Sequence, residues 1–206
     1  NDQGYENRST FLEIIADVSK VTFMPITVGG KIRSLKDIET RLLAGADKIS
    51  LNKMAIEDPR FILDAAKEFG SQCIVVSMDA KIVEGKHRIF ADGGRFETKF
   101  TPKELSMIVE GQGAGEILIN SIDRDGKGNG YDIQLLNEVA GNVDIPVIAC
   151  GGVGDWDDFA EALEETSVDA VAAANIFQYR DQSVFLAKKF LYDLNFNVRK
   201  PDLNKL

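Results

Sequence analysis

The same succession of features occurs twice in this chain, at positions 122 residues apart. In each copy an apolar segment ends in a glycine pair, which is Gly29-Gly30 in the first copy and Gly151-Gly152 in the second. A helical segment with a capping residue follows, and an aspartate, Asp47 or Asp169, then opens the next apolar segment. The offset is about half of a typical ~250-residue (β/α)8 barrel. We therefore expect a barrel built from two similar halves rather than an open sheet.

Strand-like and helical patterns alternate along the rest of the chain with short connections. Apolar strands are predicted at 23–32, 47–52, 73–81, 116–120, 146–152 and 169–177, and helices at 10–20, 34–44, 58–69, 101–111, 132–139, 155–165 and 183–194. Strands that are apolar throughout are typical of a parallel sheet buried on both faces. We predict an α/β fold, a (β/α)8 TIM barrel with a two-fold half-barrel repeat, forming a single domain over residues 1–206.

Residues 82–100 interrupt this alternation. Two segments of mixed polar and apolar residues flank the sequence ADGG, which is a turn signal, so a β-hairpin is predicted as an insertion after the strand that contains Asp79. The sole histidine, His87, lies in this hairpin and has no cysteine or second histidine near it in the sequence. We expect His87 to face solvent, and we expect neither a metal site nor a cofactor.

Composition excludes several classes of function. The net charge of −9 argues against a nucleic-acid or anionic-membrane binder, and no run of 18 apolar residues could span a membrane. The first ten residues are polar and lack the pattern of a signal peptide. Cys73 and Cys150 lie in apolar segments and are expected to be buried and reduced. These features favour a cytoplasmic protein.

Acidic residues follow two of the predicted strands. Asp79 ends one strand, and the sequence IDRDG, with Asp123 and Asp125, follows the strand at 116–120. Catalytic side chains are usually mounted at the carboxyl ends of parallel strands, so these acids are candidates for acid–base catalysis. For the second pair the alternative is structural: one aspartate caps the next turn and the other pairs with Arg124.

The glycine pairs are candidates for phosphate binding. Glycine at a strand end lets backbone N–H groups approach a phosphate, and the barrel's usual phosphate site follows its last two strands. The predicted contacts are Gly29, Gly30, Lys31, Asn52 and Lys53 in the first half, and Gly151, Gly152, Ala174 and Asn175 in the second. Two such sites suit an elongated substrate with a phosphate at each end. The alternative is that each glycine pair only makes a tight turn.

Four motifs together resemble a known family. The sequences AGADKISLN, GSQCIVVSMDAK, GAGEILINSIDRDG with GYD, and PVIACGGVG are similar to those of the cyclase subunit of imidazole glycerol phosphate synthase. The resemblance extends over nearly the whole chain, from about residue 10 to 199. It implies a half-barrel-repeated (β/α)8 lyase of histidine biosynthesis.

The resemblance also implies a chemistry. A glutaminase partner, forming a heterodimer with the cyclase, supplies ammonia that attacks a bisphosphorylated ribulosyl aminoimidazole-carboxamide nucleotide. Cleavage and ring closure give imidazole glycerol phosphate and aminoimidazole carboxamide ribotide. By the same resemblance Asp125 performs acid–base catalysis, Asp79 assists it, and Asp47, Lys48 and Glu116 line the ammonia passage at the partner interface. For these last three residues the alternative is a surface salt bridge.

The chain departs from the family pattern in two respects. The family has a strand, a helix and a second strand before the helix at 10–20, so we expect this chain to be N-terminally incomplete and to lack one catalytic aspartate. Lys31, Lys53 and Asn175 stand where the family commonly has glycine, threonine and serine. These changes resemble an alternative, a paralogue of the cyclase that delivers ammonia for sugar amidation in surface-polysaccharide biosynthesis.

Overall fold

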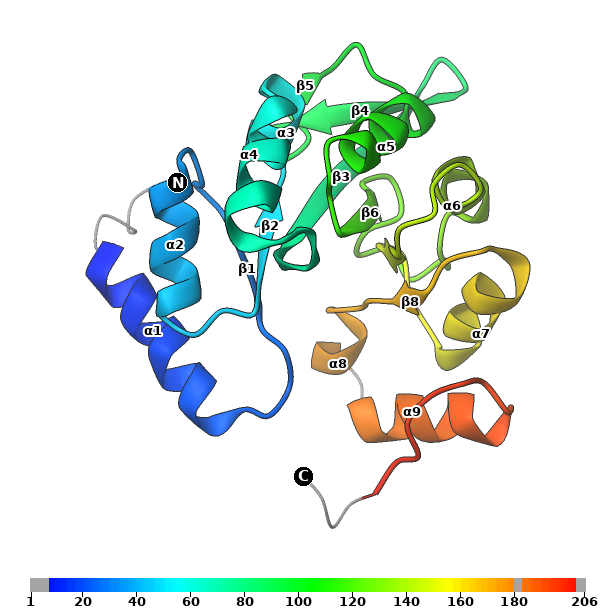
Figure 1. Ribbon diagram of the computed structural model, residues 1–206. Coiled ribbons are helices and arrows are strands. Elements are labelled where there is room, and N and C mark those ends of the chain that lie inside the picture. Colours follow the sequence, from blue (N-terminus) through cyan, green and yellow to red (C-terminus); the bar gives the residue numbers. More distant parts are fainter. Residues whose placement is uncertain (1–7, 180–182, 203–206) are drawn as a thin grey trace. The chain divides into compact units, whose positions relative to one another are not determined.

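The computed structural model describes residues 8–179 and 183–202 (Figure 1). Of these residues, those up to 77 and those at 108–116 form one compact unit, which we call unit 1. The residues at 78–107 and those from 117 onward form a second compact unit, unit 2. Strand β3 and helix α5 each begin in one unit and end in the other.

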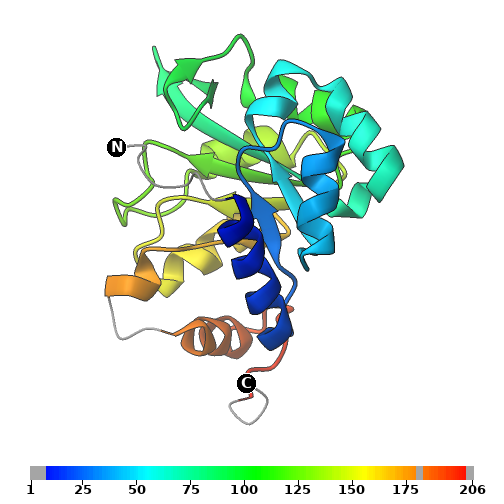
Figure 2. The same ribbon diagram turned by 90° about the vertical axis from the view of Figure 1, so that its left-hand side faces the viewer.

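Unit 1 contains the first glycine pair and the strands on either side of it. Its elements are α1 (Arg8–Val21), β1 (Thr27–Gly29), α2 (Leu35–Leu43), β2 (Lys48–Leu51), α3 (Lys53–Glu57), α4 (Arg60–Phe69), a 3-10 turn (Ser71–Cys73) and the start of β3 (Ile74–Val83). The strands pair in parallel in the order β1-β2-β3. Helices α1 and α2 lie side by side in both views (Figures 1 and 2).

Unit 2 contains the predicted insertion and the second glycine pair. Its elements are the end of β3, β4 (Lys86–Ala91), β5 (Phe96–Glu97), α5 (Pro102–Gly111), β6 (Glu116–Ser121), α6 (Ile133–Ala140), β7 (Val147–Cys150), α7 (Trp156–Glu165), β8 (Ala170–Val171), α8 (Ile176–Tyr179) and α9 (Val184–Asp193). The strand order is β3-β6-β7-β8, and β6, β7 and β8 pair in parallel. Strands β4 and β5 pair antiparallel beside β3 (Figure 1).

Parallel strands that alternate with helices and keep their chain order confirm the predicted (β/α)8 class. Two helices show how side chains fix their starts. The Ser34 side chain accepts from the Asp37 N–H at the start of α2, and Asp155 forms a capping box with Asp158 at the start of α7. These caps use backbone N–H groups that have no partner inside the helix. Within the described residues, no helix combines the length and the apolar composition that crossing a membrane requires.

Several strands differ in length from the prediction. Strand β1 is three residues long within the predicted segment 23–32, and β7 is four residues long within 146–152. Strand β3 continues past Asp79 to Val83, because β4 pairs with it from Asp79 opposite Phe90 to Val83 opposite Lys86. Strand β8 is only two residues long, and α8 follows within the segment predicted as strand. That segment is rich in alanine, which favours helix and is depleted in strands.

Candidate functional site

Asp79 is held by a neighbouring strand of unit 2. Its Oδ1 accepts a hydrogen bond of 3.2 Å from Asn120 Nδ2 on β6. The other amide atom, Asn120 Oδ1, is buried without a hydrogen-bond partner. The amide therefore fixes the orientation of the Asp79 carboxylate and keeps one buried acceptor beside it.

The two aspartates of IDRDG have different surroundings. Asp123 Oδ2 accepts from the Ile82 backbone N–H at 2.7 Å, which fastens the loop after β6 to the end of β3. Asp125 is exposed, and its backbone N–H donates to Ser121 O at 2.9 Å. The structural alternative fits Asp123, whereas the Asp125 carboxylate lies at the surface, where a substrate could reach it.

Cys150, at the end of β7, pairs with Asn120 of β6 in the sheet, and the Asn120 side chain holds Asp79. Burial raises the pKa of the Cys150 thiol, and the negative charges of Asp125 and Asp79 raise it further. The ends of β3, β6 and β7 therefore bring Asp79, Asn120 and Cys150 together, directly before the second glycine pair.

The second glycine pair requires glycine at both positions. Both residues have positive φ, 89° at Gly151 and 111° at Gly152. A Cβ at residue 151 would lie 2.5 Å from Asn120 Oδ1, and one at residue 152 would lie 2.1 Å from Gly130 O. Of the other predicted phosphate contacts, Ala174 and Asn175 are exposed, and Asn175 Nδ2 lies 3.2 Å from an ideal Cβ at Gly126. The second-half loops thus lie beside the loop that carries Asp125.

The first glycine pair, in unit 1, is built differently. Gly30 has a φ of 93° and Lys31 a φ of 53°, so a lysine occupies the left-handed region that favours glycine. Arg41 donates to Gly30 O at 2.9 Å, and Asn52 Nδ2 donates to Ser77 O at 2.9 Å. The exposed Lys53 pairs with Glu57, at 3.7 Å.

Two of the residues assigned to the ammonia passage contact each other. Lys48 Nζ forms an ion pair with the carboxylate of Glu116, and both side chains are mostly buried. The third, Asp47, accepts from the Ile26 N–H at 2.7 Å and donates its own N–H to Ile26 O at 2.9 Å. Asp47 therefore also fastens the starts of β1 and β2 together.

The expectation for His87 was wrong. It is 5% exposed, with Nδ1 3.0 Å from Glu138 Oε1 and Nε2 3.3 Å from Asp132 Oδ2. Its place in β4 could have indicated this. His87 and the buried Ile89 are two residues apart in the strand, so their side chains share one face. The prediction considered only sequence neighbours, and both partners lie on or beside α6. Among the described residues, no group of three or more His, Cys, Asp or Glu side chains is arranged to hold a metal ion.

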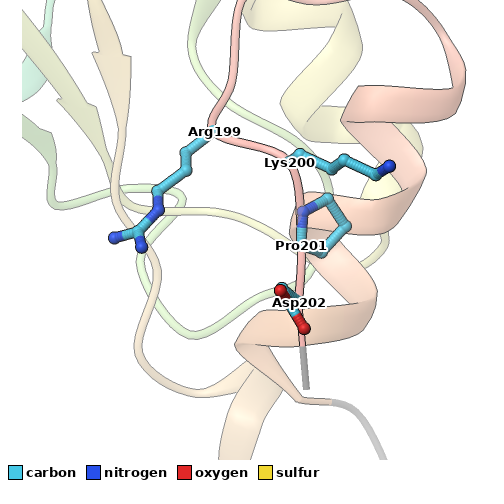
Figure 3. A pocket seen from close by; sticks show the side chains of 4 residues that line it. All are labelled: Arg199, Lys200, Pro201 and Asp202. Carbon is cyan, nitrogen blue, oxygen red and sulfur yellow. The ribbon is translucent and has the colours of Figure 1, made fainter. Parts of the chain in front are cut away.

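A recess of about 440 Å³ lies along the C-terminal segment. It is lined by Arg199, Lys200, Pro201 and Asp202, and Figure 3 shows the side chains of these four consecutive residues. None of the predicted site residues lines it. We therefore place the candidate site at the strand ends rather than at this recess.

Comparison with known proteins identifies the family. The family model described as "Histidine biosynthesis protein" matches residues 2–183. Imidazole glycerol phosphate synthase subunit HisF of Bacillus cereus (strain G9842) is 44% identical over 196 residues, which are 95% of this chain and 78% of that protein. The resemblance predicted from the four motifs is confirmed, and the chain belongs to the histidine biosynthesis protein family.

Proposed function

We propose that this chain is the cyclase subunit of an imidazole glycerol phosphate synthase and acts as a lyase in histidine biosynthesis. The identity to the Bacillus cereus subunit supports the assignment. The observation that carries it is that Asp79 is bonded to Asn120, which pairs with Cys150 immediately before Gly151-Gly152, while Asp125 lies in the loop that follows the strand of Asn120. Two acids next to a backbone that can receive a phosphate are what proton transfer on a phosphorylated substrate requires.

In this proposal the substrate is a bisphosphorylated ribulosyl aminoimidazole-carboxamide nucleotide, and ammonia is its nucleophile. Asp125 is the principal acid–base residue, because its exposed carboxylate can reach the reacting atoms. Asp79 assists from a fixed position, since Asn120 holds one of its oxygens. Together they move protons as ammonia adds and as the bond to the departing ribotide breaks.

The phosphate contacts are proposed on each half separately. Gly151 and Gly152 would present their backbone N–H groups to a phosphate, with Ala174 and Asn175 beside them. Glycine is needed at both positions because a side chain there would collide with neighbouring atoms. Gly29 and Gly30 would act in the same way in unit 1, with Asn52, Lys31 and Lys53 adding donors and positive charge. Each loop taken by itself is of the kind that binds a phosphate group.

The relative is named as a subunit, and we infer that this chain likewise works with a partner, a glutaminase that supplies ammonia. Lys48 and Glu116 are proposed to line the passage for that ammonia together with Asp47. The ion pair supports this, because two mostly buried charged side chains of opposite sign at strand starts are otherwise costly to keep.

Exchange of Asp125 for asparagine tests the function. Asp125→Asn should lower ammonia-dependent turnover of the bisphosphorylated nucleotide by about a hundredfold or more, because asparagine cannot transfer the proton. The unfolding midpoint should not move, since the side chain is exposed. Asp64→Asn, on the exposed face of α4, is the matched control and should retain full turnover. Near-normal turnover by Asp125→Asn would remove this residue from the proposed mechanism.

One observation favours a second candidate, the paralogue that delivers ammonia for sugar amidation. Lys31 keeps a left-handed backbone at a position where glycine would cost less, and Lys53 pairs with Glu57. Strained residues of this kind concentrate at functional sites, so the first-half loop is suited to an anion that differs from the usual substrate. Binding of the bisphosphorylated nucleotide to loop variants, described in the Discussion, separates the two candidates.

A further inference from the structure

The imidazole of His87 is enclosed between two carboxylates in unit 2. Both ring nitrogens face an oxygen, Asp132 Oδ2 at 3.3 Å and Glu138 Oε1 at 3.0 Å. Only the imidazolium can donate to both acids at once, because a neutral ring carries a single N–H. The side chain of His87 is 3% exposed, that of Asp132 8% and that of Glu138 33%. The charge is therefore held in the interior by specific partners.

Asp132 connects this histidine to the loop at residues 122–131. Asp132 caps α6, with Oδ1 accepting from the Leu135 N–H at 3.2 Å. Its Oδ2, which faces His87, also accepts from Ser121 Oγ at 3.4 Å and lies 3.7 Å from Arg124 Nε. Ser121 directly precedes the loop and Asp132 directly follows it, so one carboxylate joins the two ends.

Arg124 extends the same connection into the loop. Its Nη1 donates to Asn129 O at 3.1 Å and to Gly130 O at 3.4 Å. The backbone N–H groups of Arg124 and Asp125 both donate to Ser121 O, at 3.2 Å and 2.9 Å. The turn that presents Asp125 is thus closed on itself and anchored on Asp132.

We propose that His87, from the hairpin side, is a positioning residue that holds Asp132 and thereby the loop carrying Asp125. The inference rests on the proposed function, since it assigns Asp125 the acid–base role. His87 does not touch the substrate in this proposal and acts only through Asp132. Its effect is therefore expected on the step that Asp125 performs rather than on substrate binding.

The charges around the ring are consistent with this role. His87 from β4 and Arg124 from the loop face Asp132 and Glu138 from the α6 side, so two cations meet two anions. Gln134 adds a neutral donor to Glu138 Oε1 at 3.2 Å, and Ser121 adds one to Asp132. The hydrogen bond that His87 donates to Asp132, opposed by burial and helped by Glu138, raises the pKa of His87 from 6.5 to about 9. Deprotonation above that pH would leave the ring with one N–H for two carboxylates and would remove the positive charge that attracts Asp132, which would loosen the loop.

Since the chain contains a single histidine, its titration can be observed without ambiguity. The first experiment follows the imidazole and the backbone amides of 122–131 by NMR between pH 6 and 10, in the wild-type chain. We expect the amides of Asp125 and Gly126 to shift with the same midpoint as the His87 ring. Arg88→Gln, on the same strand and removing only a surface pair with Glu97 at 3.8 Å, should leave this titration unchanged. Loop amides whose chemical shifts do not change as His87 titrates would overturn the proposal.

The second experiment measures turnover with the bisphosphorylated nucleotide and ammonium salt. His87→Gln should lower kcat about tenfold with KM within about twofold, because misplacing a catalytic group affects the chemical step. In the wild type, kcat should fall at alkaline pH as His87 loses its proton. This fall should be absent from His87→Gln. A folded His87→Gln variant with wild-type kcat at neutral pH would contradict the proposal.

Two further measurements separate the possible failures. Glu138→Gln removes only the charge of the more exposed of the two carboxylates. It should lower the pH midpoint of the His87 titration, and the loop amides should still shift with that same midpoint. This variant serves if His87→Gln does not fold. If the full-length protein shows no ammonia-dependent turnover, the proposed function fails, while coupled titration of the ring and the loop would still support positioning by His87.

Discussion

Asp47 and Asp169 make the same two-bond clasp at equivalent places in the repeat. Asp47 accepts from the Ile26 N–H at 2.7 Å and donates its own N–H to Ile26 O at 2.9 Å. Asp169 accepts from the Val147 N–H at 2.9 Å and donates to Val147 O at 2.9 Å. Each aspartate gives an acceptor to a backbone N–H at the start of the preceding strand, that of Ile26 directly before β1 and that of Val147, the first residue of β7. The conserved spacing between glycine pair and aspartate within this chain therefore has a structural cause.

This pair provides a matched control for the ammonia passage. Asp47→Ala and Asp169→Ala should each lower the free energy of unfolding by about 1–3 kcal/mol, because each leaves a backbone N–H without its acceptor. With ammonium salt both variants should keep their turnover. With glutamine and the glutaminase partner, only Asp47→Ala should lose activity. Equal activity of the two variants with both nitrogen sources would show that Asp47 has only the structural role of joining the starts of two strands.

The two acids of IDRDG should respond in opposite ways to removal. Asp123→Ala should lower the free energy of unfolding by about 1–3 kcal/mol, since it strips the Ile82 N–H of an acceptor 2.7 Å away. Asp125→Ala should leave stability unchanged and abolish most turnover. Chemical denaturation and ammonia-dependent assays of both variants check this. A large stability loss in Asp125→Ala would show that its carboxylate is structural.

Stability should fall at alkaline pH in a way that depends on His87. Because the folded-state pKa is raised from 6.5 to about 9, the stabilisation from this group is complete below about pH 6.5 and is lost as the pH rises through about 9. Thermal unfolding of wild type between pH 6 and 10 should show this decline. His87→Gln should start from a lower midpoint and show a flatter dependence over the same range. Parallel curves for the two proteins would contradict the assigned charge state.

The glycines of the two loops should differ in their tolerance of a side chain. Gly152→Ala should cost several kcal/mol, because its Cβ would lie 2.1 Å from Gly130 O. Gly30→Ala meets no atom within 4 Å and carries only the cost of its φ of 93°, about 1–2 kcal/mol. Urea denaturation of both variants measures the difference. Comparable losses would mean that the loop near Gly152 moves aside to accept a Cβ.

Lys31 should be replaceable by glycine with a gain in stability. Lys31→Gly relieves a left-handed backbone worth about 1 kcal/mol, so the unfolding midpoint should rise. The double variant Lys31→Gly with Lys53→Thr should weaken binding of the bisphosphorylated nucleotide if the lysines hold a phosphate. Titration of the nucleotide into both proteins measures this. Tighter binding by the double variant would defeat the histidine-pathway assignment and favour the sugar-amidation paralogue.

Local sequence rules were sufficient for the elements and for the family. Ser34, Asp132 and Asp155 cap helices at the positions where the predicted ranges begin, because a cap depends on residues within one turn of itself. The parallel class followed from strands that are apolar on both faces, and the glycine pairs followed from a repeat visible in the chain. The same rules failed at β8. The alanine-rich segment there is compatible with a strand or a helix, and the hydrogen bond from the Phe177 N–H to Ala174 O belongs to the turn at the start of α8.

The partners of the functional side chains depended on tertiary structure. His87 lies 45 residues from Asp132 and 51 from Glu138, and Lys48 lies 68 residues from Glu116. No local pattern specifies such pairs, because strand order and hairpin packing bring them together. The residues alone proposed both Asp123 and Asp125, and the family resemblance selected Asp125. The bond from the Ile82 N–H then shows that Asp123 fastens the loop. Residue types and their spacing thus determined what chemistry is available, while long-range packing decided which groups are occupied in holding the fold and which remain for a substrate.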